Sequence, residues 1–335
     1  MDRLDAEFFD VAACSEWIAV YYNDGLIGCP EEKLEIITAS RIEGRAAVKQ
    51  LAIYGHPQAG APEMDIVSTE RPKTMRMVFY PVAGGQPEEV VLRLQGVICR
   101  AALPPKRMTY RSATTSARYL QQSFTLTGFN NPSFNMAVEG AYSIAESLGR
   151  HADNMAPWYP GRFEECVAVE VCNRLFTRQN NDNPLAAVDI ESSIDPHGSL
   201  LTLAGGEYVH TEENTVRYFK YLKSPTGVVS YVNAQAASFK AGDIVEAQLS
   251  VIALPSRDGR QTMKLILRAM TLLDDAFSKA ARIAFLKTPV RQEARGAMVP
   301  PKGKPRRQVG YDEDTVDEMS KRVKGMQMDS DGPAV

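Results

Sequence analysis

Alternating apolar and polar residues predict two β-hairpins and two further strands in this chain. Residues 78–82 and 90–94 repeat apolar side chains with a period of two on either side of Gly84-Gly85, which is the pattern of half-buried strands joined by a turn. Residues 239–274 contain two longer alternating segments that meet at Asp258-Gly259, and Asp-Gly is the strongest short-range hairpin signal. Further strands are predicted at 119–127 and 166–174, although a helix is nearly as compatible with the second of these segments.

Apolar residues at helical spacing predict three helices. The longest covers residues 135–153, where the apolar side chains form a single stripe. Residues 44–54 carry apolar side chains at positions 47, 48, 51 and 52, which lie on one helical face. Asp195-Pro196 supplies a capping residue and a first-turn proline for a short helix that Gly205 would end.

These elements predict an α+β protein with two domains and a tail. Residues 1–156 mix helices and strands, and residues 157–286 become rich in β structure, with the long hairpin 239–274 suggesting a barrel-like sheet. Residues 287–310 hold seven basic residues and one acidic residue, whereas 311–331 hold seven acidic and three basic residues. Such charged, proline-containing sequence buries too little apolar surface to offset its ordering entropy. We therefore expect residues 287–335 to form a disordered tail.

The composition narrows the class of protein. With 335 residues, 44% hydrophobic and 24% charged, the chain is too apolar to be disordered throughout and long enough for two cores. It contains no apolar run of the ~18 residues that span a bilayer, and its acidic start does not resemble a secretory signal. We therefore expect a soluble, intracellular protein that does not bind membranes. The cysteines, which include no CxxC pair, are expected to be reduced thiols: Cys14, Cys29, Cys99, Cys166 and Cys172.

Two resemblances add to this picture. The blocks YVHTEENTVRYF, FKAGDIVEAQLS and LRAMTLLD, together with GFNNPSFNMAVEGAYSIAESLGRHADNMAPWYPGRFE and NRLFTRQNNDNPLAAVDIESSID, resemble a group of uncharacterised proteins from mushroom-forming (basidiomycete) fungi. This likeness covers roughly residues 110–275 and implies a source, not a function. The order of WIAVYY, EGRAAVKQL, a hairpin and LQQSFTL is similar to that of the nuclear transport factor family, which implies a cystatin-like cone for the N-terminal domain. The finish that this family has after its last strand is not matched by FNNPSFNMAVEGA.

A basic stretch gives the main functional hypothesis. Residues 90–138 contain no acidic residue, and aromatic side chains are interleaved with the basic ones. Nucleic-acid-binding surfaces combine these residue types because cations neutralise phosphates and aromatic rings stack on bases. The alternative is that the cations lie on a solvated face and the aromatic residues in the core. The predicted nucleic-acid-binding residues are Arg93, Arg100, Lys106, Arg107, Arg111 and Arg118.

A second cationic cluster lies in the expected tail. Short basic clusters in accessible segments are read by nuclear import receptors or bind polyanions through charge. The alternative is a segment that only keeps the protein in solution. The predicted import signal comprises Lys302, Lys304, Arg306 and Arg307, and on this basis we expect a nuclear protein, or otherwise a cytoplasmic one.

One cluster points to an enzyme. His197, His210 and Glu212 could together hold iron or zinc and leave positions open for water or substrate. The alternative is structural, with Asp195 capping a helix, His197 in its first turn and 211–214 forming a polar turn. The glycine-rich pieces AGGQ and AGGE lack the patterns of phosphate-binding loops, and we expect no cofactor.

The sequence therefore favours a nuclear factor that associates with nucleic acid or with other proteins and is not an enzyme. Its expected partners are DNA or RNA, or protein. The rival hypothesis is a metal-dependent enzyme that uses the His/His/Glu site.

Overall fold

The computed structural model describes residues 30–42, 44–55, 62–70, 73–81, 85–105, 116–152, 154–179 and 184–287. These residues all belong to one compact unit, which ends at Lys287. None of the helices in these ranges combines the length and the apolar character needed to cross a membrane. The remainder of the expected tail, and with it the predicted import signal, lies outside the described residues.

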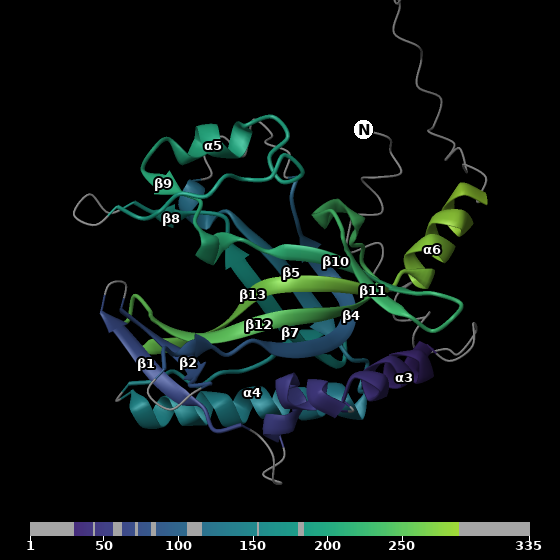
Figure 1. Ribbon diagram of the computed structural model, residues 1–335, viewed down its shortest axis with the longest axis horizontal. Helices are drawn as coiled ribbons and strands as arrows, with labels where there is room; N and C mark the ends of the chain where they lie inside the picture. Colours follow the sequence, from purple (N-terminus) through teal and green to yellow (C-terminus); the bar gives the residue numbers. More distant parts are fainter. Residues whose placement is uncertain are drawn as a thin grey trace, which may run out of the picture. The chain divides into compact units, whose positions relative to one another are not determined.

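Five strands close into a barrel (Figure 1). Going around it, β4 pairs with β5, β5 with β7, β7 with β13, β13 with β12, and β12 again with β4. The β7–β13 pair is parallel and the other four pairs are antiparallel. The bounds of the barrel strands are Leu92–Ala102 for β4, Gln121–Thr127 for β5, Cys166–Arg174 for β7, Ile244–Pro255 for β12 and Gln261–Asp274 for β13.

The barrel has the topology of the OB-fold. If its strands are numbered one to five along the chain, the order around the barrel is 1-2-3-5-4-1, with strands three and five parallel. This closed, five-stranded Greek-key arrangement defines the fold. Alternate residues point inwards, as the period of a strand requires, so that Leu94, Phe124 and Val171 lie in one buried cluster with Leu249 and Leu267.

The barrel joins segments that we expected to belong to different domains. The β-rich, barrel-like sheet predicted around 239–274 is confirmed, but its strands are not confined to residues 157–286. Both β4 and β5 come from the N-terminal half, where a cystatin-like cone was expected, and they pair with β12 and β7. A boundary after residue 156 therefore does not separate two cores, because one sheet and one buried cluster run across it.

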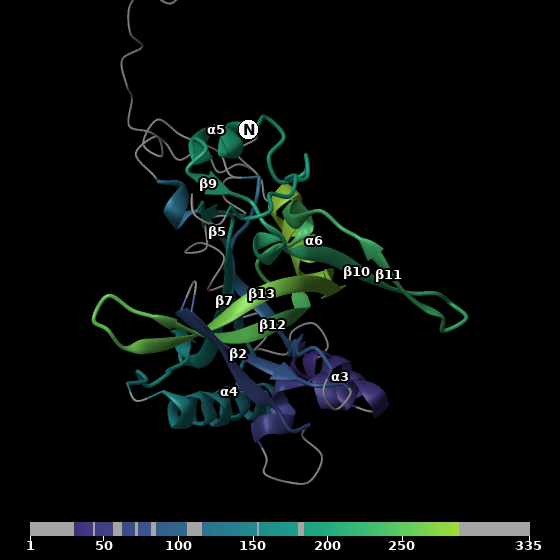
Figure 2. The same ribbon diagram turned by 60° about the vertical axis from the view of Figure 1, so that its left-hand side comes forward.

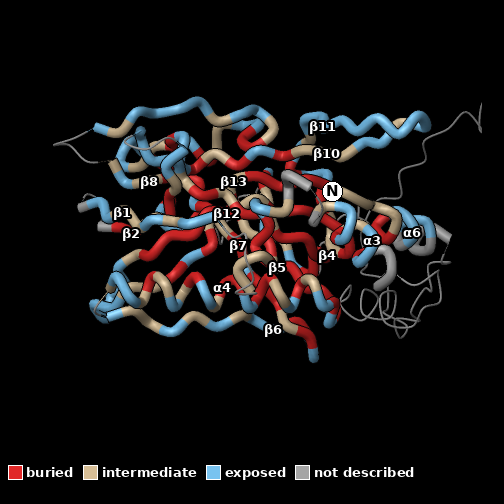
Figure 3. The backbone as a smooth tube through the Cα atoms, turned by 60° about the horizontal axis from the view of Figure 1, so that its bottom comes forward, coloured by how far each residue is buried: buried red, intermediate tan, exposed pale blue. Residues whose placement is uncertain are grey.

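Further strands extend the sheet beyond the barrel. Strands β1 and β2 continue from β12, and the β10–β11 hairpin continues from β13 and projects away from the barrel (Figure 2). Figure 3 shows buried residues along the barrel strands, whereas β11 is exposed along its length. The first predicted hairpin is only a short β2–β3 pair, because β4 leaves it to enter the barrel. The bounds are Asp65–Glu70 for β1, Lys73–Phe79 for β2, Glu88–Glu89 for β3, Gly161–Phe163 for β6, Arg217–Lys223 for β10 and Val229–Asn233 for β11.

Helix α4 (Pro132–His151) lies below the barrel strands in Figures 1 and 2. Its first turn is capped by Asn131, whose side-chain oxygen accepts hydrogen bonds from the amides of Ser133 and Phe134 at 3.0 and 3.3 Å. The backbones of α4 and η2 (Leu51–Gly55) touch directly through two glycines. A Cβ on Gly140 would lie 2.1 Å from the Leu51 carbonyl oxygen, and one on Gly55 would lie 2.2 Å from that of Met136.

The remaining helices are short or peripheral. The helix expected over 44–54 is two 3-10 helices, and the one expected from Asp195 to Leu203 starts later, at Ser199. Their bounds are Pro30–Ile42 for α3, Gly44–Lys49 for η1, Ala117–Tyr119 for η4, Ser199–Ala204 for α5, Glu212–Asn214 for η5, Ala236–Ser238 for η6 and Ala276–Lys287 for α6.

Asp243, directly before β12, is fully buried and makes folding stability depend on pH. Its Oδ2 accepts a hydrogen bond from the Lys240 amide at 2.8 Å. Burial raises the pKa of this carboxyl group to about 7, so the folded protein holds its proton more tightly than the unfolded chain does. This group's contribution to stability therefore decreases as the pH rises from about 4 to about 7.

We expect Asp243→Asn to stabilise the protein more at pH 8 than at pH 5, because asparagine is neutral at both values. The difference between the two gains should be about 2 kcal/mol in the free energy of unfolding. Urea unfolding of both proteins at the two pH values measures it. Equal effects at pH 5 and pH 8 would contradict the raised pKa.

Candidate nucleic-acid interface

The structure separates the basic residues that the sequence grouped together. Arg93 on β4 lies beside the buried carboxylate of Glu246, with 3.8 Å between its Nη1 and Oε1. Arg100, near the end of β4, and Arg118, in η4, are exposed. Three of the six predicted residues, Lys106, Arg107 and Arg111, lie outside the described residues. Arg118 lines the pocket described next.

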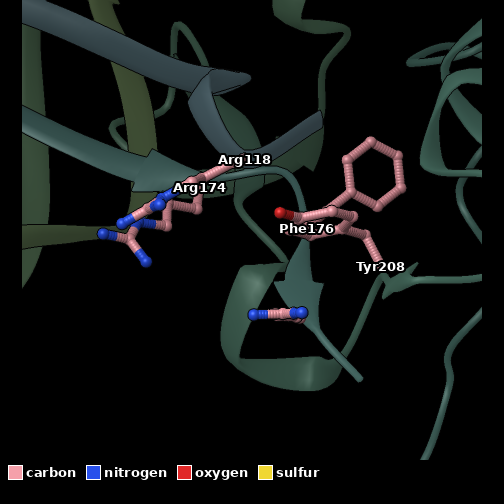
Figure 4. Close-up of a pocket in the computed structure, with 5 residues that line it drawn as sticks. Arg118, Arg174, Phe176 and Tyr208 are labelled. Atoms are coloured by element: carbon pink, nitrogen blue, oxygen red, sulfur yellow. The ribbon is translucent and has the colours of Figure 1, made fainter. Parts of the chain in front are cut away.

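This pocket lies at the end of β7 and has a volume of about 230 Å³. We call it the arginine pocket; it is lined by Arg118, Arg174, Phe176, Arg178 and Tyr208. Figure 4 shows Arg118 and Arg174 together on one side of it, with the aromatic side chains on the other and the Tyr208 hydroxyl pointing towards the arginines. Cationic and aromatic groups therefore face the same small space.

Two β pairings hold the lining residues in place. Arg174 is the last residue of β7 and pairs with Gln121 of β5, three residues after Arg118. Beyond it, β8 (Thr177–Arg178) and β9 (Tyr208–Val209) form a two-stranded ribbon in which Arg178 is directly opposite Tyr208. Strand pairing thus places two arginines on the barrel side and one on the ribbon side.

A small core supports the pocket from below. Phe176 is 1% exposed and packs in this core, and its ring meets that of His210 edge-on at 6.4 Å between centroids. Asp195 fixes the start of α5 by accepting hydrogen bonds from the amides of Leu200 and Leu201 at 2.9 and 3.0 Å. The buried apolar members of this core are Ala117, Leu120, Leu175, Phe176, Ile194, Leu200 and Ala204.

The three guanidinium groups of the pocket have no carboxylate partner among the residues that the structure describes. Within the described part of the chain, none of them forms an ion pair with a carboxylate. The Arg118 guanidinium instead lies 5.8 Å from the centre of the neighbouring Tyr119 ring, which is 61% exposed. Unpaired arginines in a pocket are available to an anionic ligand, and arginine suits phosphate because its planar donors bind two oxygens at once.

The outer face of β5 and β7 continues from the pocket. Its pairs bring Ser123 opposite Cys172 and Thr125 opposite Glu170. These side chains are small or exposed, and Lys264 of β13 is exposed nearby. Burial raises the pKa of the Cys172 thiol, so this thiol is protonated at neutral pH. This outer face carries polar side chains and charges of both signs, whereas all the charged side chains that line the pocket are arginines.

The predicted metal site does not form. His210 is buried, and both of its ring nitrogens face protein groups: Nδ1 lies 2.7 Å from the Leu175 carbonyl oxygen and Nε2 lies 3.4 Å from the Thr215 hydroxyl. Glu212 is exposed and pairs with Arg217 at 3.6 Å, and His197 is exposed. No group of three potential ligands comes together anywhere in the described ranges. The structural alternative for Asp195 as a helix cap matches the hydrogen bonds observed.

Sequence reasoning missed four of the five pocket residues. Arg174 and Arg178 lie outside the basic stretch, and a bend at Leu175 separates β7 from β8 between them. A strand period therefore does not mark these residues as one site. Tyr208 joins them only through the β8–β9 pairing, which has no local signature.

Comparison with known proteins finds no family for this chain and a distant likeness to a solved structure. No family model matches the chain, and no curated protein matches it. A solved structure with some likeness is that of gp2.5, a single-stranded DNA binding protein encoded by bacteriophage T7, with 11% sequence identity and a TM-score of 0.29. The match covers 56% of this chain and 92% of that one. A likeness this distant does not assign a function.

Proposed function

We propose that this protein binds single-stranded nucleic acid through the arginine pocket and the adjoining face of β5 and β7. The observation that carries the proposal is that three arginines, none of which forms an ion pair with a carboxylate of the described residues, line one pocket together with the Tyr208 ring. Cations that neutralise phosphates and rings that stack on bases are the two components of single-strand binding sites. A fold alone does not fix a function, so the proposal rests on this site.

The position of the pocket supports the proposal. OB-folds that bind oligonucleotides use the face of their second and third strands and the loop between the first and second. Here those strands are β5 and β7, and the pocket lies at the end of that face. The predicted residues Lys106, Arg107 and Arg111 belong to the connection between β4 and β5, outside the described residues, and their part in binding stays a prediction.

The Tyr208 ring in the pocket favours an unpaired strand. Aromatic side chains bind single strands by stacking on their bases. A base can reach Tyr208 only when it is free of its complementary strand. We therefore propose DNA or RNA in single-stranded form as the partner; nuclear location through Lys302, Lys304, Arg306 and Arg307 remains a separate prediction.

Salt-dependent titrations test this function. We expect the full chain to bind a labelled 20-mer of dT or U with an affinity that falls steeply between 50 and 300 mM salt. The log–log slope should be about -2 to -3, because each neutralised phosphate of a single strand contributes about -0.7 and three to four contacts are expected. A blunt-ended duplex of the same length should bind more weakly. No binding to either strand at low salt, or equal binding of the duplex, would refute the proposal and favour association with protein.

A further inference from the structure

The arginine pocket carries more positive charge than is needed to neutralise one phosphodiester inside a strand. Arg118, Arg174 and Arg178 all line this one pocket of about 230 Å³, so up to three cations can meet a single phosphate there. A phosphodiester inside a strand carries a single negative charge, whereas a phosphomonoester carries about -1.5 to -2 at pH 7. Three cations without an ion-pair partner in the described ranges match the phosphomonoester better than the phosphodiester.

The surroundings of the pocket also suit the end of a strand. Arg174 is the last residue of β7, and the chain then enters the lobe formed by residues 175–210, which carries β8, α5 and β9 at one end of the barrel (Figures 1 and 2). A strand that follows the face of β5 and β7 meets this lobe at the pocket. The β8–β9 ribbon thus stands where the next nucleotide would have to continue.

We propose that the arginine pocket binds the terminal phosphomonoester of a single strand. This inference rests on the proposed function and adds the part of the ligand that the pocket recognises. Arg118 and Arg174 hold the phosphate from the barrel side and Arg178 from the ribbon side, while the Tyr208 hydroxyl, which points towards the arginines in Figure 4, donates to a phosphate oxygen. The Tyr208 ring contacts the terminal nucleoside, and the buried Phe176 supports it from below.

Three oligonucleotides test the inference. The full chain is titrated with 12-mers of dT that carry a 5′-phosphate, a 3′-phosphate or hydroxyl groups at both ends, each measured by competition against the same labelled strand. We expect one of the phosphorylated strands to bind about tenfold more tightly than the strand without a phosphate. Which of the two binds more tightly identifies the end that enters the pocket.

Two variants separate the pocket from general charge. Arg178→Ala should abolish the preference for the phosphorylated end. Arg150→Ala removes an exposed arginine from α4, which lies on the far side of the barrel from the lobe, and should leave the preference unchanged. Both side chains are exposed, so thermal unfolding should show that both variants remain folded.

The pH dependence offers an independent readout. The second ionisation of a phosphomonoester has a pKa of about 6, whereas a phosphodiester does not titrate in this range. The preference for the phosphorylated strand should therefore decrease severalfold between pH 7.5 and pH 5.5. A preference that is constant over this range would mean that the second charge is not recognised and would overturn the inference.

Two further outcomes would overturn the inference, and they differ from failure of the proposed function. Equal affinity for all three 12-mers would remove the terminal phosphate as the ligand but leave single-strand binding intact. Competition by inorganic phosphate as strong as that by thymidine 5′-monophosphate or 3′-monophosphate would show that the nucleoside is not recognised. If none of the 12-mers binds at low salt, the proposed function itself fails.

Discussion

Replacing Arg118, Arg174 and Arg178 together with alanine is expected to weaken the binding of a single-stranded 20-mer about 100-fold at 50 mM salt. Each lost guanidinium removes a charge-assisted contact with phosphate, and such contacts are among the strongest hydrogen bonds in proteins. The log–log salt slope should become shallower by about 0.7 to 1.4, because the one phosphate in the pocket, with one or two negative charges, would no longer be neutralised at about 0.7 per charge. Anisotropy titrations at several salt concentrations measure both quantities.

A second triple variant controls for net charge. Arg150, Arg217 and Arg282 are exposed arginines on α4, β10 and α6, and replacing all three with alanine changes the net charge of the protein equally. This control should bind within about threefold of the natural chain, because charges that do not contact the strand act only through a screened field. Equal weakening by the two triple variants would show that the pocket is not the site.

The second large effect concerns stability, at the contact between α4 and η2. Gly140→Ala is expected to lower the free energy of unfolding by about 3 kcal/mol, because the new Cβ would lie 2.1 Å from the Leu51 carbonyl oxygen. Backbone atoms cannot rotate away as a side chain can, so α4 and η2 must separate and open the core between them. Urea unfolding monitored by circular dichroism measures the loss.

Another glycine of the same helix supplies the matched control. A Cβ on Gly149 would find Met155 at 3.9 Å, which is an ordinary contact. Gly149→Ala should therefore raise the free energy of unfolding by about 1 kcal/mol, because alanine is the better helix former. Opposite signs for the two substitutions are expected. A stabilising Gly140→Ala would contradict the close backbone approach.

The sequence predicted those elements in which the pattern of apolar and polar residues is regular over many positions. The hairpin of β12 and β13 alternates over many residues around Asp258-Gly259, and the apolar stripe of α4 is equally regular. Segment 44–54 was misassigned because a few apolar residues at helical spacing do not distinguish an α-helix from two 3-10 helices. Strand β1 was missed because Asp65–Glu70 is too polar to alternate clearly.

Closure of the barrel and formation of the pocket depend on pairings between distant segments. Strand β4 alternates as expected, but nothing local indicates that it pairs with β12 rather than with the preceding β2. In the basic stretch, Arg118 lines the pocket, whereas Arg93 has the same side-chain type and lies beside Glu246. Composition thus indicated a cationic surface without showing which cations would be free of carboxylates.

The way in which the barrel closes determines when it can form on the ribosome. Strands β4 and β12 pair through residues that are 147 to 157 positions apart, from Val97 with Ile244 to Leu92 with Leu249. The barrel therefore stays open until β13, which ends at Asp274, has been synthesised. At 5–20 residues per second the apolar face of β4 waits roughly 10 to 30 s for its partner. During synthesis the apolar face of β4 is thus exposed to chaperones and to other chains, and a fragment that ends before β12 cannot close the barrel.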